Sequence, residues 1–551
     1  MKRNQLADFG SCILLVLLSI GPMCSDASYH GCGHANYNGY FNTSIGHHRC
    51  RSGSDSKWVN HGNGLKNQRR AKDSVINRNT VSSMTQSWTF PATFDVTATP
   101  AIADGAIYFP AWDGMLYALN EKTGELLWRT NLLAVANASY STGARATPTI
   151  WGRVLLIGLQ GPASVVSVDR SSGAIMWISP TLDDSPYAVI TTSGTVYDGY
   201  MYVGISSLQE VFTCCTFQGS FLKISASDGS VVWRTLMVPP NSNYTGVAVW
   251  GSSPAIDRER GLVYIATGNN YDLPDSVEAC EAERLQNATI SPDTCQDPRN
   301  HVDSMLALNI DDGAIAWSRR LEAYDVWRLE CQLSPDAPGC PDILGQDYDF
   351  GEAPMLIYLD RSSSTYGKQT DNVTCIAVAG QKSGVVWALD CDTGSIVWST
   401  AAGPGGTLGG AIWGSCTDGE RVYTNIANNE RRNFTLAPSN ETTNGGGWVG
   451  MDAATGEVLW TTAEPSGGYA FGPLSVSDGV VFATSYTSSG DVYALDGLTG
   501  AILWHGTTGA GIYGGVSISR DCIFVGNGYE FLSLPTYNGT GVFAFCLKDG
   551  D

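Results

Sequence analysis

Residues 118–128 read ALNEKTGELLW, and this eleven-residue pattern occurs seven times along the chain. A small residue usually comes first, an acidic or polar residue follows two positions later, a glycine six later and a tryptophan ten later. The other copies begin at Ser167, Lys223, Ala307, Ala388, Gly450 and Ala494. Seven copies in one register cannot arise by chance, so the repeat decides the architecture.

Each copy predicts two strands joined by a tight turn. The alternating apolar residues Met115, Tyr117 and Leu119 predict the first strand, the Thr-Gly pair supplies left-handed turn geometry, and residues 126–128 begin the second strand. A polar, Gly-rich link then leads to another strand pair. A unit of roughly 40 to 50 residues with four short strands is typical of a β-propeller blade.

The two ends of the propeller sequence indicate the number of blades. Ala544, Cys546 and Gly550 occupy the small, polar and glycine positions of an eighth copy, which lacks its tryptophan. Residues 86–90, QSWTF, supply Trp88 with no motif before it. We therefore expect an all-β, eight-bladed propeller whose last blade is closed by the N-terminal strand; seven blades is the alternative.

The chain divides into three predicted parts: a signal peptide (1–27), an irregular arm (28–85) and the propeller (86–551). Lys2 and Arg3 precede an apolar run at 12–20 that is too short to span a bilayer, as in a cleaved secretory signal. This predicts a secreted, extracellular protein with no integral membrane span. The net charge of −21 argues against nucleic acid as a partner.

Glycosylation sequons and paired cysteines agree with export. The sequons are at Asn42, Asn137, Asn243, Asn287, Asn372, Asn433, Asn440 and Asn538. The local cysteine pairs are Cys32 with Cys50, Cys280 with Cys295, Cys331 with Cys340, Cys375 with Cys391, and Cys522 with Cys546, which leaves Cys416 over. No CxxCH motif occurs, which excludes a covalently bound c-type haem.

The Trp-containing repeat resembles the docking motif of quinoprotein alcohol dehydrogenases, which are eight-bladed propellers with pyrroloquinoline quinone (PQQ) and a divalent ion on the axis. Segments 58–70 (WVNHGNGLKNQRR), 97–114, 145–150 (RATPTI) and 251–269 (GSSPAIDRERGLVYIATGN) look like the polyvinyl-alcohol-dehydrogenase-like branch. The resemblance covers about residues 58–551. It implies an alcohol dehydrogenase that uses PQQ and Ca²⁺.

The resemblance also implies roles for individual residues. Trp250 stands where the family stacks an indole on the quinone, Thr191 where a threonine contacts it, and Arg145 where an arginine binds its carboxylates. Lys382 has the spacing of the cation at the quinone's carbonyl edge. The expected oxygen ligands of Ca²⁺ are Glu210, Asn269, Asp347 and Asp349.

The catalytic base is expected in residues 346–356, QDYDFGEAPML, where Gln346 replaces the family's tryptophan. Spacing to the following strand favours Asp347 over Asp325. Two features depart from the family pattern: Thr97 stands where a glutamate is common, and the vicinal pair Cys214-Cys215 follows Glu210, in a later blade than the family's vicinal disulfide. Residues 270–303, 328–370 and 427–448 are predicted insertions in face loops.

In the implied mechanism, Asp347 accepts the proton of a small-molecule or polymeric alcohol, and electrons pass to a separate acceptor. The main alternative is a non-catalytic extracellular propeller that serves as a binding or scaffold module. A carbohydrate-acting propeller with paired aspartates ranks last, because Asp347 and Asp349 are too close along one loop to flank a glycosidic bond.

Overall fold

The computed structural model describes residues 57–548 apart from 93, 137–142, 213, 252, 288–293, 323, 360–372 and 531–533. Residues Ser54–Asp551 form one compact unit, and the fold below is that unit. The predicted signal peptide, the beginning of the arm, and four residues used above lie outside the described residues: Asn42, Asn137, Asn372 and Gly550. The pair Cys32 and Cys50 also lies outside them.

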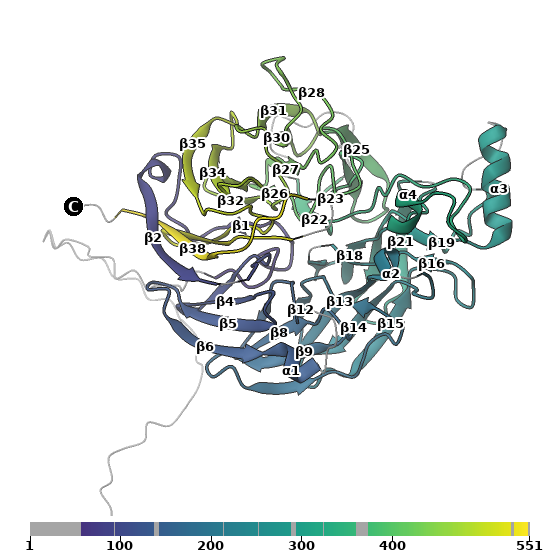
Figure 1. The fold of residues 1–551 in the computed structure, drawn as a ribbon, viewed down its shortest axis with the longest axis horizontal. Helices are drawn as coiled ribbons and strands as arrows, with labels where there is room; N and C mark the ends of the chain where they lie inside the picture. Colours follow the sequence, from purple (N-terminus) through teal and green to yellow (C-terminus); the bar gives the residue numbers. More distant parts are fainter. Residues whose placement is uncertain are drawn as a thin grey trace, which may run out of the picture. The chain divides into compact units, whose positions relative to one another are not determined.

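Eight antiparallel sheets form the blades (Figure 1). Blade 1 contains β3 (Ala101–Ala103), β4 (Ala106–Pro110), β5 (Met115–Asn120) and β6 (Leu126–Asn131); blade 2 contains β7 (Thr149–Trp151), β8 (Val154–Gly158), β9 (Val165–Asp169) and β10 (Ile175–Ile178). Blade 3 contains β12 (Thr195–Tyr197), β13 (Tyr200–Ser207), β14 (Ser220–Ser225) and β15 (Val231–Leu236), with β11 (Ala188–Val189) at the end of β13; blade 4 contains β17 (Ala255–Asp257), β18 (Leu262–Ala266), β20 (Ser304–Asn309) and β21 (Ile315–Arg320).

The second half of the chain repeats this order. Blade 5 contains β22 (Met355–Tyr358), β23 (Cys375–Gly380), β24 (Val385–Asp390) and β25 (Ile396–Ala401); blade 6 contains β26 (Cys416–Thr417), β27 (Arg421–Ile426), β30 (Gly447–Asp452) and β31 (Val458–Ala463). Blade 7 contains β32 (Ser475–Ser477), β33 (Val480–Thr484), β34 (Asp491–Asp496) and β35 (Ile502–Thr507); blade 8 contains β36 (Ser517–Ser519), β37 (Cys522–Gly526), β38 (Gly541–Leu547) and β2 (Met84–Pro91).

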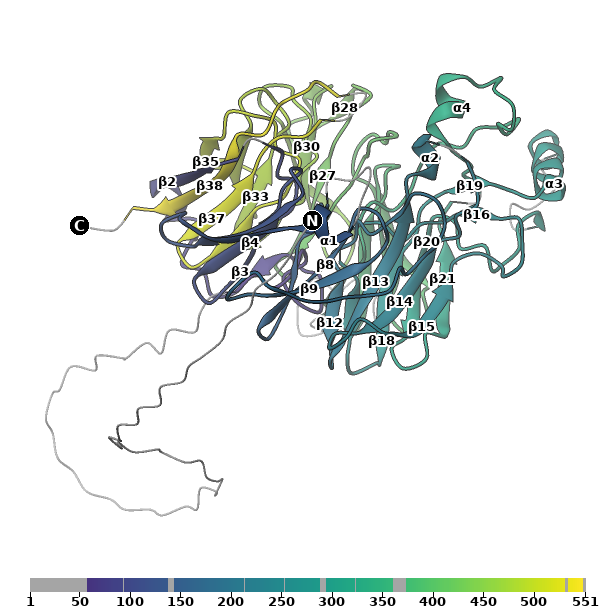
Figure 2. The same ribbon diagram turned by 60° about the horizontal axis from the view of Figure 1, so that its bottom comes forward.

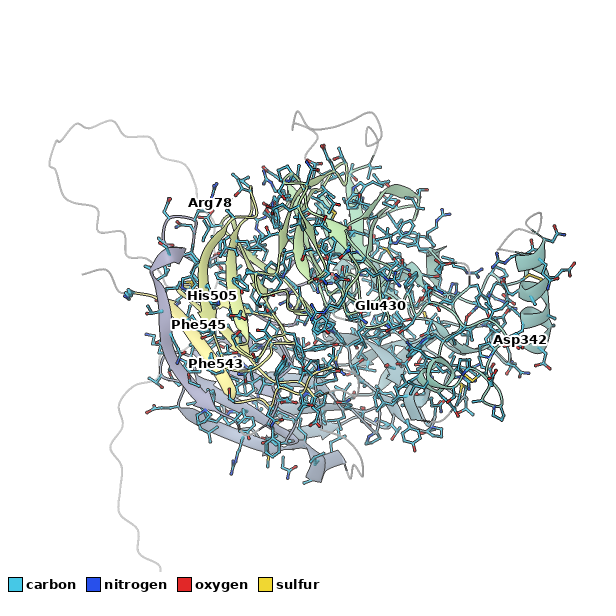
Figure 3. All side chains as sticks on the ribbon, turned by 45° about the horizontal axis from the view of Figure 1, so that its top comes forward. Arg78, Asp342, Glu430, His505, Phe543 and Phe545 are labelled. Carbon is cyan, nitrogen blue, oxygen red and sulfur yellow. A yellow bond between two sulfur atoms is a disulfide. The ribbon has the colours of Figure 1, made fainter. Side chains whose placement is uncertain are left out.

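Blade 8 joins the two ends of the propeller sequence. β2 pairs antiparallel with β38, and Trp88 lies opposite Ala544. Phe543 and Phe545 lie on β38 beside this closure (Figure 3). The first strand of blade 8, β36, packs beside β3 of blade 1. These contacts confirm the predicted eight-bladed propeller and its closing strand, and the seven-bladed alternative is wrong.

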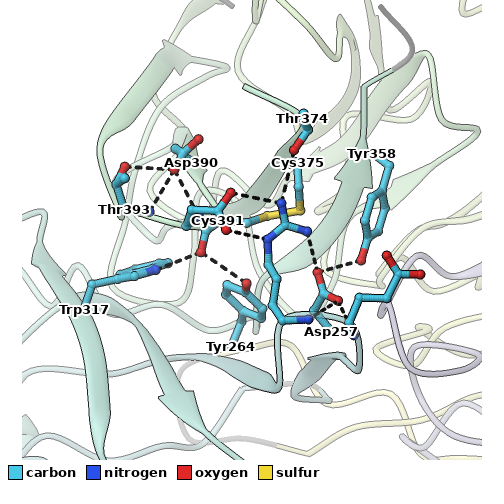
Figure 4. A network of polar contacts seen from close by, with 12 residues as sticks. Asp257, Tyr264, Trp317, Tyr358, Thr374, Cys375, Asp390, Cys391 and Thr393 are labelled. Atoms are coloured by element: carbon cyan, nitrogen blue, oxygen red, sulfur yellow. Dashed lines mark hydrogen bonds and ion pairs between the residues drawn. A yellow bond between two sulfur atoms is a disulfide. The ribbon is translucent and has the colours of Figure 1, made fainter. Parts of the chain in front are cut away.

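The repeat docks each blade on the next. The indole Nε1 of Trp317 donates to the carbonyl of Cys391, 2.9 Å away in the following blade (Figure 4). A Cβ at Gly394 would lie 2.5 Å from the Trp317 ring, and Gly394 has φ +66°. The first position is small because it lies directly across the hairpin from the tryptophan, as Ala388 does from Trp398. Docking therefore explains the small, glycine and tryptophan positions together.

Residues 58–75, which we call the strap, bond to every blade in turn. Their partners in blades 1 to 8 are Ile102, Ile150, Thr195, Ile256, Leu356, Thr417, Val476 and Arg520. Within the strap, β1 (Arg70–Ala71) pairs with β32 in parallel. Most of these partners belong to the innermost strands, so the strap runs around the centre of the ring. The part of the predicted arm that the structure describes is thus built into the propeller.

The remaining helices and strands lie outside the eight blade sheets. They are η1 (Val81–Ser83), α1 (Leu132–Ala136), α2 (Gln209–Phe212), α3 (Asp275–Gln286), α4 (Leu329–Leu333) and the strand pairs β16 (Thr245–Gly246) with β19 (Asn270–Asp272) and β28 (Phe434–Thr435) with β29 (Thr442–Thr443). Elements α2, α4 and β28 lie at the same end of the blades (Figure 2). Among the described residues, none of the helices is long and apolar enough to cross a bilayer.

Disulfide bonds tie several loops and strands. Four predicted pairs are bonded: Cys280–Cys295, Cys331–Cys340, Cys375–Cys391 and Cys522–Cys546. Cys214 is bonded to Cys215, and Cys416 is a buried free thiol. The last two predicted pairs link neighbouring strands within blades 5 and 8, which fits the cross-strand spacing that a disulfide requires.

Candidate functional site

The eight predicted site residues all lie in loops at one end of the blades. Connections from the second to the third strand of a blade, and from the fourth strand to the next blade, emerge on the same face of an antiparallel propeller. Glu210, Asn269 and Lys382 lie in the first kind of connection. Arg145, Thr191, Trp250, Asp347 and Asp349 lie in the second kind. Residues from blades 2 to 5 therefore reach one region.

Trp250 and Asp349 form the centre of this region. The indole Nε1 of Trp250 donates to Asp349 Oδ2 at 2.8 Å, and the backbone N–H of Asn269 donates to Asp349 Oδ1 at 2.8 Å. Thr191 Oγ1 donates to the carbonyl of Trp250 at 3.0 Å. Four predicted residues thus make direct contacts.

Lys382 joins this centre through a buried ion pair. Its Nζ lies 2.7 Å from Asp347 Oδ1, 3.5 Å from Asp349 Oδ2 and 5.2 Å from the centre of the Trp250 ring. Burial lowers the pKa of Lys382, but the charges of Asp347, Asp349 and Glu210 outweigh burial and raise it, so the ammonium stays protonated. Burial raises the pKa of Asp347, and the adjacent Lys382 opposes that rise.

Asp325 holds the loop that carries Asp347. Its carboxylate accepts the backbone N–H groups of Asp347 at 3.0 Å and of Tyr348 at 2.5 Å. Asp347 has φ +59°, in the left-handed region, so this turn needs external hydrogen bonds to fix its shape. Asp325 is therefore placed as a support for the loop, while Asp347 makes the contact with Lys382.

Glu210 lies in α2, at the end of β13, and is half-buried. Burial raises its pKa to about 8, the negative charge of Asp349 adds to the rise, and Lys382 opposes it. These interactions place Glu210 near the other carboxylates. A bound cation would offset this cost, because it favours the ionised form of each carboxylate around it.

Arg145 and Thr191 line a central cavity together with Thr97, His61, Trp413 and Tyr513. The Arg145 guanidinium lies 5.0 Å from the centre of the Trp413 ring. Trp413 in turn meets Trp250 edge to face, with centroids 5.2 Å apart. The cavity thus connects the cationic Arg145 with the Trp250 centre through an aromatic wall. His61 belongs to the strap, which contributes to one side of the cavity.

The vicinal disulfide Cys214–Cys215 follows α2 and packs in the hydrophobic cluster that also contacts Trp250. Arg328, at the start of α4, approaches Cys215 Sγ at 3.7 Å. Helices α2 and α4 also contact each other. The segments that carry α2 and α4 therefore meet next to the candidate site.

Several residues at the site were not predicted from the sequence. Asp303 is fully buried and forms a group with Asp325 and Asp349, in which one carboxylate oxygen of each lies within 4.8 Å of the others. Trp413 and Tyr513 belong to blades 6 and 8 and lie outside the docking repeat, as Trp250 does. The one available signal was the position of Asp303, where the insertion of blade 4 returns to β20.

The residues present fit the groups that the resemblance implies. Asn269 directs its side-chain Nδ2 to two backbone carbonyls, each at 2.9 Å, which leaves Oδ1 oriented away from them as a candidate ligand. The carboxylate and amide oxygens are the donors that Ca²⁺ prefers. The indole of Trp250 with the ammonium of Lys382 beside it, and the guanidinium of Arg145 in the neighbouring cavity, suit a planar, tricarboxylated quinone.

Comparisons with known proteins agree with this arrangement. The family model described as outer membrane protein assembly factor BamB matches residues 70–235 and 370–540, more than half of the chain. The chain is 26% identical over 526 residues to a polyvinylalcohol dehydrogenase of Sphingopyxis sp. (strain 113P3), covering 87% of this chain and 73% of that protein. It is 28% identical over 395 residues to a polyvinylalcohol dehydrogenase of Pseudomonas sp, covering 67% of this chain and 55% of the relative.

A solved structure shares the fold. The quinohemoprotein alcohol dehydrogenase of Comamonas testosteroni superposes with a TM-score of 0.66 at 16% identity, covering 91% of this chain and 82% of that one. At this identity the likeness concerns the fold. The family match shows that the chain belongs to the family of that model, and the solved structure agrees with its propeller fold.

Proposed function

We propose that this protein is an oxidoreductase that oxidises an alcohol with PQQ and a hard cation such as Ca²⁺, and that it passes the electrons to a separate acceptor. The observation that carries the proposal is the convergence of Trp250, Lys382, Asp347 and Asp349 through direct contacts at the centre of the ring. The similarity to polyvinylalcohol dehydrogenases supports an alcohol as substrate and makes polymeric and secondary alcohols candidates.

The bound groups supply the redox chemistry: PQQ is the two-electron acceptor and the cation polarises its carbonyl. Trp250 provides the flat surface on which the quinone rests. Its indole is held in place by Asp349 through Nε1 and by Thr191 through its carbonyl. Arg145 lines the cavity beyond Trp413 and would neutralise carboxylates of the quinone.

Asp347 is the proposed base. Its Oδ1 already accepts a hydrogen bond from Lys382, whose positive charge favours the ionised carboxylate and opposes the rise in the pKa of Asp347 that burial causes. Oδ2 is then the atom that takes the alcohol proton. Asp325 prevents the loop from turning away, because it bonds both backbone N–H groups of the Asp347–Tyr348 pair.

The test is reconstitution of the purified protein with PQQ and Ca²⁺. We expect quinone absorbance on the protein and alcohol-dependent reduction of an artificial dye. Asp347→Asn should keep the absorbance and lower dye reduction by at least about 100-fold, because a general base contributes roughly 10² to 10⁴ in rate. Lack of quinone binding by the wild type would refute the proposal.

We further propose that the protein is exported and N-glycosylated. Five sequon asparagines lie among the described residues, and all five are exposed: Asn243, Asn287, Asn433, Asn440 and Asn538. The disulfides also suit an oxidising compartment. Treatment of the protein from a glycosylating host with an amidase specific for N-glycans should lower its mass; an unchanged mass would contradict glycosylation.

A non-catalytic scaffold is the weaker alternative. A scaffold has no need for a buried ammonium among several carboxylates, since such a group costs stability unless it has a function or exact partners. The buried Lys382 and Asp347 thus favour the enzyme.

A further inference from the structure

A group of three buried aspartates includes Asp349, one of the expected ligands, together with two aspartates that are not among the ligands expected from the family pattern. Asp303, Asp325 and Asp349 are 0%, 1% and 3% exposed, and one oxygen of each lies within 4.8 Å of the others. Asp303 precedes β20, Asp325 lies near the start of the loop between blades 4 and 5, before α4, and Asp349 lies near the end of the same loop. From this geometry we propose that Asp303, Asp325 and Asp349 form a cation site of their own, with Asp349 shared between it and the site of Glu210 and Asn269.

The buried carboxylate of Asp303 indicates a ligand. Both of its carboxylate oxygens are buried and accept no hydrogen bond from an N–H or hydroxyl group among the described residues; their polar contact is with the carboxyl group of Asp325. A buried carboxylate without donors is costly, and such groups are normally hydrogen-bonded, paired or bound to a metal. The backbone of Asp303 is fixed, since its N–H donates to the carbonyl of Gly268 and its carbonyl accepts from Leu321. The side chain is therefore held toward the other two carboxylates without an N–H or hydroxyl donor among the described residues.

The charges of the whole region support a second cation. Glu210 and the four aspartates at 303, 325, 347 and 349 bring five carboxyl groups together, and among the described residues their only ion pairs are with Lys382. One ammonium and one divalent ion supply three positive charges. Two carboxylates remain without compensation unless another cation binds or protons do.

The donors define the class of ion. Three carboxylates offer hard oxygen ligands, and no imidazole or thiolate belongs to the group. Oxygen-only sets select Ca²⁺, Mg²⁺ or a trivalent ion of similar size over zinc or copper. Each carboxylate oxygen of Asp325 accepts one backbone N–H and has a second lone pair that can bind an ion. The support of the loop by Asp325 is therefore compatible with binding of a cation.

This site would link the cation to the catalytic loop. A cation bound to Asp325 would fix the carboxylate that accepts the backbone N–H of Asp347. Because the cation would also bind Asp349, it would fix the acceptor of the Trp250 indole N–H as well. Asp303 and Asp325 would thus be positioning residues. The inference rests on the proposed function only for this link to the reaction; binding of the ion stands on the geometry of the three aspartates.

The experiment counts ions on the full chain without PQQ. Protein freed of metal by a chelator is titrated with Ca²⁺ and, separately, with Tb³⁺, whose emission is excited through nearby tryptophan. Bound metal per chain is measured by elemental analysis after gel filtration. We expect two ions per wild-type chain, one in Asp303→Asn and one in Glu210→Gln. Asp311→Asn, which changes an exposed aspartate in the same blade, is the matched control and should keep two.

The outcomes separate this inference from the proposed function. A single ion that Asp303→Asn removes and Glu210→Gln retains supports the aspartate site and refutes the ligands proposed for the quinone's cation. A wild-type count that Asp303→Asn leaves unchanged overturns the inference, and so does the absence of any bound ion. If no ion binds, Asp303 holds a proton, and Ca²⁺ should leave the melting temperatures of both the wild type and Asp303→Asn unchanged. Quinone absorbance is measured separately and reports on the proposed function alone.

Discussion

Glu352 shows how this protein accommodates a buried carboxyl group. It is 1% exposed, and its carboxylate accepts hydrogen bonds from Ser415 Oγ at 2.9 Å and 3.2 Å and from the backbone N–H of Gly380. Burial raises its pKa to about 7, although these hydrogen bonds oppose the rise. Unlike Asp303, Glu352 has partners, so hydrogen bonding explains it without a ligand.

This raised pKa predicts a pH dependence of stability. Between about pH 4.5 and 7 the unfolded chain loses the Glu352 proton while the folded protein keeps it, so the free energy of unfolding falls as pH rises, by roughly 3 kcal/mol in total. Glu352→Gln should remove this contribution because it stays neutral. Denaturant titrations of both proteins across this pH range provide the measurement, and parallel curves would contradict the assignment.

The blades are positioned relative to one another by the packing of a tryptophan of one blade on a glycine of the next. The same contact recurs around the ring: Trp88 packs on Gly124, Trp128 on Gly173 and Trp460 on Gly500, with the added Cβ of each glycine 2.5 to 2.6 Å from the indole. Trp504, for which the eighth blade lacks such a glycine in the described residues, donates to the carbonyl of Met84 at the start of β2. Blade 7 therefore docks on the closing strand.

A pair of glycine variants isolates the energy of docking. Gly394 and Gly261 both have φ +66°, but a Cβ on Gly394 meets Trp317 while a Cβ on Gly261 meets nothing within 4 Å. Gly394→Ala should destabilise the protein by about 1 to 3 kcal/mol more than Gly261→Ala, since the backbone strain is the same and the clash is not. Equal midpoints of unfolding for the two variants would show that docking adds little.

The whole molecule is held together by the strap as well as by the blades. Arg69 is fully buried and donates to acceptors on several elements: His61, Leu474, Thr99, Ser475 and Val516. These acceptors belong to the strap and to blades 1, 7 and 8. One side chain thus fastens the strap across the point where the ring closes.

Loss of this side chain should weaken the closure. Arg69→Met leaves several buried acceptors without a donor, and we expect it to lower the free energy of unfolding by more than about 3 kcal/mol. Arg70→Met is the control, because Arg70 is half-buried and its side chain bonds the carbonyl of Asp418. Thermal unfolding followed by circular dichroism compares the two; a similar small loss in both would contradict the role of Arg69.

The sequence by itself determined the propeller, the number of blades and the closing strand, because the repeat records contacts between neighbouring hairpins. The positions of Trp88 and Gly394 could be predicted since each contact recurs at a constant spacing. Similarity to a known family pointed to Trp250, Lys382 and Asp347, which the structure brings together, although their roles are still predictions.

Only the tertiary structure decided what the non-repeating residues do. The strap has no regular apolar pattern, because its bonds run to one residue in each of eight blades that are far apart along the chain. For Asp303 the sequence offers only its position, where the insertion of blade 4 returns to β20, and this does not identify it as a ligand. The proposed role of Asp303 depends on its contact with Asp325 and Asp349, which lie in the loop between blades 4 and 5. The carboxylate of Asp303 is buried there without an N–H or hydroxyl donor among the described residues.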